Sequence, residues 1–273
     1  MEIILYGFIF CFGAIIGSFL NVVIYRMHTG KSLSGRSHCL TCGVNLSWYE
    51  LFPIFSYLAQ GAKCRSCNAY IPSRYLFVEL LTACSFVLLW SLFGHSLVLF
   101  GLHVILVSTL IVLALYDVRH TIIPDELTAI IFVCACLFLG LQYYELRAVQ
   151  PILQSIFGGV LASGFFGALW AVSKGRWIGL GDAKLALPFG MMVGLSGVFG
   201  VVVLSFWVGA GVSLSILGLQ HILKGGKISL LFLRTPLTMK SEVPFAPFLI
   251  VGFLLVHLYH VDIFTLTNVF ISF

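Results

Sequence analysis

The sequence predicts an all-α, polytopic membrane protein with about eight transmembrane helices and a cytoplasmic, zinc-ribbon-like loop. Three observations carry this prediction: the scarcity of charge, the length of the apolar segments, and the positions of lysine and arginine. Hydrophobic residues make up 60% of the 273 residues and charged residues only 9%, with a mean hydropathy of +1.08. Soluble domains carry about 25% charged residues, so this chain cannot cover itself with a water-facing surface.

Eight apolar segments approach or exceed the roughly 20 residues that a helix needs to cross the hydrocarbon core. The run 183–222 is too long for one crossing, and its glycine-containing stretch 194–197 is the expected turn. The first segment lacks a basic start and is too long for a signal peptide, so we expect it to stay as a span. The predicted spans are residues 4–25, 75–94, 97–116, 127–145, 152–172, 183–198, 199–222 and 243–262.

The basic residues predict an orientation, because lysine and arginine concentrate in cytoplasmic loops. If the N-terminus faces outward, the inside loops are 26–74, 117–126, 173–182 and 223–242. These loops and their edges hold every lysine and arginine except Arg147. Topology therefore accounts for the net charge of +5, and we expect a lipid bilayer and no nucleic acid as partner.

Small residues recur every four positions in the segment 152–172, as Ser155, Gly159, Ser163 and Gly167. Apolar helices in lipid associate through small residues that let their backbones approach. We interpret this stripe as a helix-packing seam.

Four cysteines form two C-x-x-C pairs in the one long polar segment, with 21 residues between Cys42 and Cys64. This spacing predicts a tetrahedral zinc site made by Cys39, Cys42, Cys64 and Cys67. Two disulfides are the alternative, which the predicted cytoplasmic location disfavours. Four thiolates leave no position for a catalytic water, so the zinc is expected to be structural and to stabilise a loop too small for its own core.

Two aspartates lie at the predicted cytoplasmic border of the membrane. Asp117 ends the third segment, and Asp182 begins the sixth within Gly179-Leu180-Gly181-Asp182. Ionisable residues at membrane depth are costly and are candidates for function. Two carboxylates that meet can share a proton, so that one activates water while the other donates to a carbonyl, as in aspartyl proteases. Interfacial ion pairs with the basic side chains Arg119, Lys184 or Arg176 remain the alternative.

Two further acids have assignable positions. Glu79 lies about one turn inside the second segment, where we expect it to face protein and to bind a cation or an amino terminus. Asp125 follows Pro124, and proline followed by an acidic residue is typical of a helix start.

Five motifs occur in order along the chain and together resemble the bacterial type IV prepilin peptidases, which are bifunctional leader peptidases and N-methyltransferases. The resemblance covers essentially the whole length. The motifs are Gly17 to Arg26, the paired C-x-x-C loop with Pro53 and Ser56-Tyr57-Leu58, Asp117 with Ile123-Pro124-Asp125, Gly179-x-Gly181-Asp182-x-Lys184, and Pro244 to Phe248.

The resemblance implies that Asp117 and Asp182 form the catalytic pair. It implies a cut after a glycine at the cytoplasmic face of the inner membrane, releasing a basic leader from type IV prepilins or pseudopilins. S-adenosylmethionine would then methylate the new amino terminus. The candidate residues for that cofactor are Gly17, Ser18, Asn21 and Glu79.

The expected domains are residues 1–74, which carry the zinc loop and are associated with methylation, and the peptidase region 75–273. An ion-coupled transporter is disfavoured because the carboxylates lie at a membrane edge and no internal repeat is evident. A non-enzymatic assembly factor would depend on the cysteines and not on the aspartates.

Overall fold

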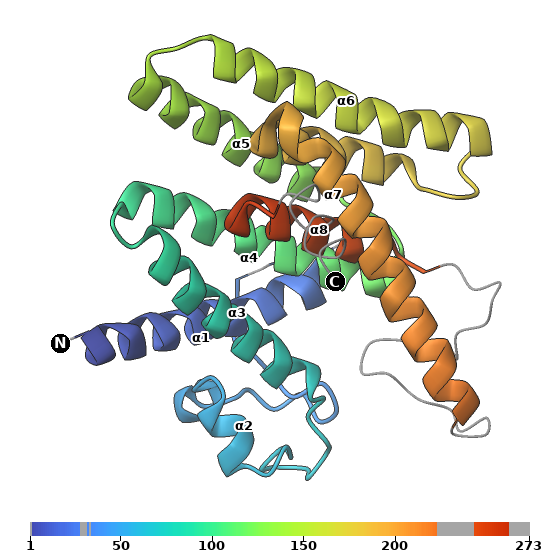
Figure 1. The fold of residues 1–273 in the computed structure, drawn as a ribbon. Helices are drawn as coiled ribbons and strands as arrows, with labels where there is room; N and C mark the ends of the chain where they lie inside the picture. The colour runs from blue at the N-terminus through green and yellow to red at the C-terminus, as the bar shows by residue number, and fades with distance from the viewer. Residues whose placement is uncertain (1, 28–31, 33, 223–242, 262–273) are drawn as a thin grey trace. The chain divides into compact units, whose positions relative to one another are not determined.

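The computed structural model describes residues 2–27, 32, 34–222 and 243–261, and every regular element within them is helical. The predicted all-α class is confirmed. Figure 1 shows the elements α1 (Glu2–Arg26), η1 (Trp48–Leu51), α2 (Phe55–Ala59), α3 (Arg74–Phe93), α4 (Leu97–His120), α5 (Asp125–Leu146), α6 (Gln150–Ser173), α7 (Leu180–Ile222) and α8 (Ala246–Tyr259).

Six helices of the described chain, α1 and α3 to α7, are long and apolar enough to cross a membrane, and α8 is a shorter apolar helix of 14 residues. Each of the eight predicted segments overlaps a helix, although α8 covers only Ala246–Tyr259 of the predicted 243–262. Two of them share α7, which is interrupted at Gly194 (φ 70°, ψ 176°), inside the stretch where a turn was predicted. The predicted inside loop 223–242, with Lys224, Lys227, Arg234 and Lys240, lies outside the described residues, as do Lys31, Glu242 and Asp262.

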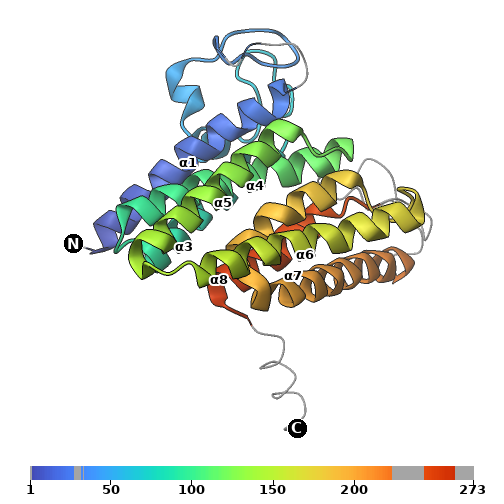
Figure 2. The ribbon, with the colours of Figure 1, turned by 90° about the horizontal axis from the view of Figure 1, so that it is seen from above.

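The chain divides into two compact units, Met1–Val112 and Leu113–Phe273, and the division falls within α4. The predicted boundary lay between residues 74 and 75. The structure groups α3 with α1 because these two helices pack closely, as Figures 1 and 2 show. A Cβ atom on Gly13 would lie 2.7 Å from the Ala83 Cα, and one on Gly17 would lie 2.8 Å from the Glu79 Cα.

In the second unit, α7 packs against α5, α6 and α8. Figure 2 shows α6 and α7 side by side, and their backbones nearly touch at Gly158 and Gly190. On the side facing α8, Phe189 stacks on Phe253 with ring centroids 4.1 Å apart. These contacts hold the beginning of α7, where Asp182 lies, within a packed core.

The predicted packing seam is half right. Ser155 is buried and Gly159 contacts α7, but a Cβ on Gly167 would meet nothing within 4 Å. The buried face continues instead through Gly158 and Ala162. An α-helix has about 3.6 residues per turn, so a stripe at strict intervals of four rotates away from the partner helix after one or two repeats.

Candidate active sites

The Gly-x-Gly-Asp motif builds the first turn of α7. Gly179 precedes the helix, and its backbone N–H donates to Asp182 Oδ2 at 3.1 Å, which is one half of a capping box. Gly181 faces the preceding loop so closely that a Cβ there would lie 2.9 Å from the Ile123 Cβ. The two glycines therefore have separate tasks: one orients the carboxylate, and the other lets α7 approach the segment before α5.

Asp117 lies near the end of α4, and its side chain is only 4% exposed. Its carboxylate interacts with the backbone N–H of Ala246, the first residue of α8. The positive end of a helix dipole and its free N–H groups stabilise a carboxylate at that place. The sequence motif Pro244 to Phe248 thus begins the helix whose N-terminus contacts Asp117.

The structure brings the two aspartates together. Asp182 is 6% exposed, and its carboxylate is close enough to that of Asp117 for the two charges to interact. Asp117 Oδ2 and Asp182 Oδ1 are buried without a hydrogen-bond partner among the described residues. Buried polar atoms nearly always have partners, so two bare acceptors in one place mark a site for water or substrate.

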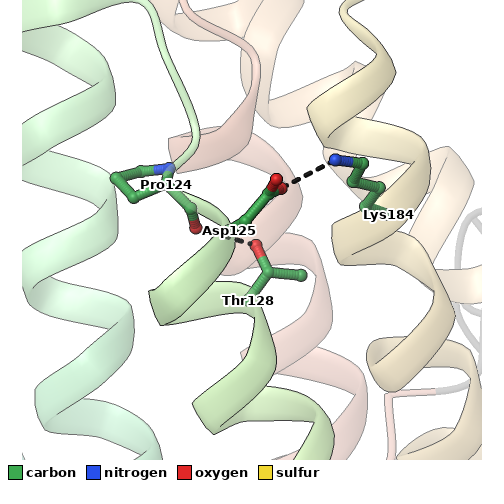
Figure 3. Close-up of polar contacts among 4 residues, drawn as sticks. All are labelled: Pro124, Asp125, Thr128 and Lys184. Atoms are coloured by element: carbon green, nitrogen blue, oxygen red, sulfur yellow. Dashed lines mark hydrogen bonds and ion pairs between the residues drawn. The ribbon is translucent and has the colours of Figure 1, made fainter.

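Two of the basic residues that could have formed ion pairs with Asp117 or Asp182 bind other groups instead. Lys184 Nζ bonds to Asp125 Oδ1 at 2.7 Å, and Arg176 Nε donates to the Ser173 carbonyl oxygen. Figure 3 shows the Lys184–Asp125 pair beside the first turn of α5, where the Thr128 hydroxyl donates to the Pro124 carbonyl oxygen. Both charged side chains of the pair are exposed, and Asp125 is the first residue of α5 as predicted.

The two C-x-x-C pairs fold as structural copies of one another. In the first, Cys39 N–H donates to the Val44 carbonyl oxygen and Gly43 N–H to that of Cys39, each at 2.9 Å. In the second, Cys64 N–H donates to Ala69 and Asn68 N–H to Cys64, also at 2.9 Å. Gly43 and Asn68, each directly after a second cysteine, both have positive φ, as glycine and asparagine tolerate best.

This geometry fits a zinc ion. The four Sγ atoms lie within 4.8 Å of one another, and Cys39 and Cys67 are 3.8 Å apart. A tetrahedral site with Zn–S bonds of about 2.3 Å requires sulfur separations of about 3.8 Å. The backbone N–H groups of Cys42 and Thr41 lower the pKa of Cys39, whereas the neighbouring cysteine sulfurs raise the pKa of Cys67, so the cluster favours one thiolate and a bound metal would stabilise the others. Zinc at Cys39, Cys42, Cys64 and Cys67 would close the loop as a structural centre.

A cavity of about 200 Å³ lies in the first unit between the cysteine loop and the helices α1 and α3. Three of the residues predicted for the methyl donor line it: Ser18, Asn21 and Glu79. Gly17, the fourth, packs behind them against the backbone of Glu79. Asn21 Nδ2 donates to the Tyr75 carbonyl oxygen at 3.1 Å, which ties α1 to the first turn of α3.

The loop side of the cavity includes the ligands Cys39 and Cys64, so the wall of the cavity depends on the fold around the metal site. Two charged residues at the cavity already bind backbone. Arg26 Nη1 donates to the carbonyl oxygens of Ser32 and Ser34, both at 2.8 Å, and Glu50 Oε2 accepts the Ser47 N–H at 2.8 Å.

Sequence reasoning missed several residues at these sites. Tyr25, Tyr57 and Tyr75 supply aromatic surface to the cavity, and the first two lie inside motifs noted above. Ile54 was not singled out, yet it has φ 64° and ψ −56° and donates its N–H to Glu79. The contact of Asp117 with the Ala246 N–H involves a backbone group, which nearly every residue type has, so the sequence gives no sign of it.

Comparison with known proteins gives a family for both units. Residues 11–93 match the model of the bacterial peptidase A24 N-terminal domain, and residues 104–214 match that of the type IV leader peptidase family. No solved structure matches.

Individual relatives agree with these models. A prepilin leader peptidase/N-methyltransferase of Bacillus subtilis (strain 168) is 33% identical over 92% of this chain and 93% of its own length. Its namesake in Myxococcus xanthus is 34% identical over 77% of this chain, a match that spans 62% of that protein. Another in Pseudomonas aeruginosa is 28% identical over 90% of this chain and 88% of its own. The chain therefore belongs to the family of prepilin leader peptidase/N-methyltransferases.

Proposed function

We propose that this protein is an intramembrane aspartyl endopeptidase of the inner membrane that removes the leader of type IV prepilins or pseudopilins after a glycine. The observation that carries this proposal is the pair of buried, unpartnered oxygens, Asp117 Oδ2 and Asp182 Oδ1, on interacting carboxylates. The cut takes place at the cytoplasmic face, in accord with the distribution of lysine and arginine.

The chemistry follows from two carboxylates that share one proton. The ionised member removes a proton from water, and the resulting nucleophile attacks the scissile carbonyl carbon. The protonated member donates to the carbonyl oxygen and later supports proton transfer to the leaving amine. The N–H groups of Gly179 and Ala246 hold one side of each carboxylate, so the opposite oxygens stay oriented for this work.

The second activity is methylation of the new amino terminus, with S-adenosylmethionine as donor at the cavity of the first unit. Tyr25, Tyr57 and Tyr75 line the cavity together with Ser18 and Asn21, and we expect the sulfonium and the adenine to contact these side chains. Aromatic faces attract cations and stack on bases. Structural zinc would hold the loop that forms one wall of this cavity.

A single assay tests both activities. The purified protein is incubated with a prepilin and methyl-labelled S-adenosylmethionine, and leader loss is read by mass separately from methyl incorporation. Asp117→Asn and Asp182→Asn should each lower cleavage by about 10³-fold or more, because each removes one partner of the acid–base pair.

Asp125→Asn is the matched control, since Asp125 is exposed and pairs with Lys184 at the surface. It should cleave at nearly the normal rate. Normal leader removal by Asp117→Asn or Asp182→Asn would rule out the aspartyl mechanism.

A further inference from the structure

Glu79 is a buried carboxylate at the cavity of the first unit. It lies in the second turn of α3, is only 7% exposed, and lines the cavity together with Ser18 and Asn21. Burial of a carboxylate is costly unless hydrogen bonds or an opposite charge compensate. Its surroundings therefore indicate what kind of ligand it is built to receive.

Two protein groups contact the carboxylate. The Ile54 N–H donates to Glu79 Oε2 at 2.8 Å, and the Ser18 hydroxyl forms a second hydrogen bond. An ionised carboxylate has about four acceptor positions. Two of them are occupied by these donors, which leaves acceptor capacity on a group that borders the cavity.

The donor Ile54 is held in an unusual backbone conformation. Its φ of 64° and ψ of −56°, with the Phe55 N–H bonded to the Pro53 carbonyl oxygen at 2.6 Å, define a γ-turn of the rare, strained kind. A β-branched residue with positive φ is a genuine outlier, and such outliers persist where surrounding contacts hold them, often at ligand sites. The turn fixes the direction of one carboxylate oxygen and so orients the other.

The free acceptor positions of Glu79 match an ammonium group. The processed substrate carries one at its new amino terminus and the methyl donor carries one on its methionine part, so the measurement of S-adenosylhomocysteine binding is what separates these two ligands. A sulfonium has no N–H to donate and is attracted to aromatic faces rather than to hydrogen-bond acceptors. An ammonium group carries three N–H donors and matches the remaining lone pairs of a carboxylate. The other carboxylate at the cavity, Glu50, is half-buried and closes the capping box of η1 by accepting the Ser47 N–H, so its position is explained without a ligand.

We propose that Glu79 binds the newly exposed α-ammonium group of the processed substrate and accepts its proton before methyl transfer. This inference rests on the proposed methyltransferase function. The substrate ammonium transfers one proton to the Glu79 carboxylate. The freed nitrogen lone pair forms the N–C bond to the donor methyl group as the C–S bond breaks, and its electron pair stays on sulfur. The products are a secondary ammonium, S-adenosylhomocysteine and the protonated Glu79.

The test uses the full-length protein, a substrate that already lacks its leader, and methyl-labelled S-adenosylmethionine. Glu79→Gln keeps a carbonyl oxygen for the Ile54 N–H and loses the charge and the base. We expect methyl transfer to fall by about 10²–10⁴-fold, the usual contribution of a general base. Binding of S-adenosylhomocysteine, measured by calorimetry, should stay within about threefold, because the donor contacts other groups. The matched control is Glu145→Gln, an exposed glutamate of α5, which should behave as wild type.

A second variant distinguishes two roles of Glu79, accepting a proton in methyl transfer and holding the Ile54 turn by a hydrogen bond. Ile54→Gly adopts positive φ without strain, so the turn no longer needs its anchor. If Glu79→Gln combined with Ile54→Gly still fails to transfer methyl while the cysteine loop resists protease as in wild type, the base role stands. Recovery of methyl transfer in that double variant would reduce Glu79 to an anchor and overturn the proposal.

Other outcomes are equally decisive. Wild-type methyl transfer by Glu79→Gln alone would overturn the proposal, and loss of S-adenosylhomocysteine binding would assign Glu79 to the donor and overturn it as well. Wild-type protein that neither binds S-adenosylhomocysteine nor transfers methyl would instead sink the proposed methyltransferase function itself.

Discussion

The two units each bury carboxylates but stabilise the surroundings of those carboxylates in different ways. Around Asp117 and Asp182 the order comes from helix packing, with glycines such as Gly181 letting backbones approach. Around Glu79 one wall is a loop of short turns and two C-x-x-C pairs, in which large side chains such as Trp48, Phe55 and Tyr70 are exposed. The first site should therefore survive loss of metal, and the second should not.

The strongest test of this difference is removal of the metal. Cys64→Ser, or chelation of the wild-type protein, should abolish methyl transfer, because structural zinc supplies the folding energy of such loops. Leader cleavage should persist. Metal content by plasma mass spectrometry and limited proteolysis of the loop would accompany both assays. Cys84→Ser, an exposed cysteine of α3, is the control. Equal loss of both activities in Cys64→Ser would show that the two sites are not separable.

Gly181→Ala should have the opposite effect and lower leader cleavage but not methyl transfer. The added Cβ would lie 2.9 Å from the Ile123 Cβ, so the first turn of α7 must shift together with Asp182. Displacement of a catalytic group by about 1 Å can cost about 10²-fold in rate. We expect a loss of that order in leader cleavage with methyl transfer retained.

The control for Gly181→Ala is Gly164→Ala, because a Cβ on Gly164 meets nothing within 4 Å. Removing the opposing Cβ with Ile123→Gly should restore part of the cleavage rate. If it does not, the close contact is not the cause of the loss.

Gly17→Ala should weaken methyl transfer more moderately. Its Cβ would lie 2.8 Å from the Glu79 Cα and so separate α1 from α3, and overpacking of this kind costs about 1–3 kcal/mol. We expect a fall of about tenfold in methyl transfer, in line with the lower half of that range. Gly7→Ala, on the same helix in open space, should leave the rate unchanged. Equal rates for both variants would contradict the close packing of α1 on α3.

The smallest effect is expected for the Lys184–Asp125 pair, although Lys184 lies within a family motif. The side chains are 47% and 75% exposed, and exposed ion pairs contribute only about 0–1 kcal/mol. Lys184→Met should change the cleavage rate by less than about threefold and the melting temperature by a few degrees at most. A cleavage loss comparable to that of Gly181→Ala would show that Lys184 has a role beyond this pair.

The sequence predicts those features that depend on the surrounding solvent, such as apolar helices in lipid, or on one ligand, such as cysteines around a metal ion. Apolar length located the helices, and the cysteine spacing located the four clustered thiols. The meeting of Asp117 and Asp182 was inferred from shared membrane depth, and the structure brings their carboxylates within electrostatic range.

Details that depend on tertiary contact were not accessible. The prediction that the packing seam reaches Gly167 was wrong, because an α-helix completes a turn in about 3.6 residues and positions four apart gradually leave the contact face. Isoleucine at position 54 gives no sign of positive φ, since its preference is for the opposite region, and its hydrogen bond to Glu79 is visible only in the structure. The role of Ala246 rests on its backbone, which the identity of the residue does not encode.

The interruption of α7 at Gly194 restricts which substitutions this position tolerates. Its φ and ψ lie in a region that is open to achiral glycine and to D-amino acids and essentially closed to every other genetically encoded residue. Replacement of Gly194 by a residue with a side chain would strain this break and favour one continuous helix over the 43 residues Leu180–Ile222, a rod of about 65 Å. Hydrocarbon about 30 Å thick cannot hold such a rod upright, so a substitution at Gly194 should impair membrane insertion although it changes no residue of either active site.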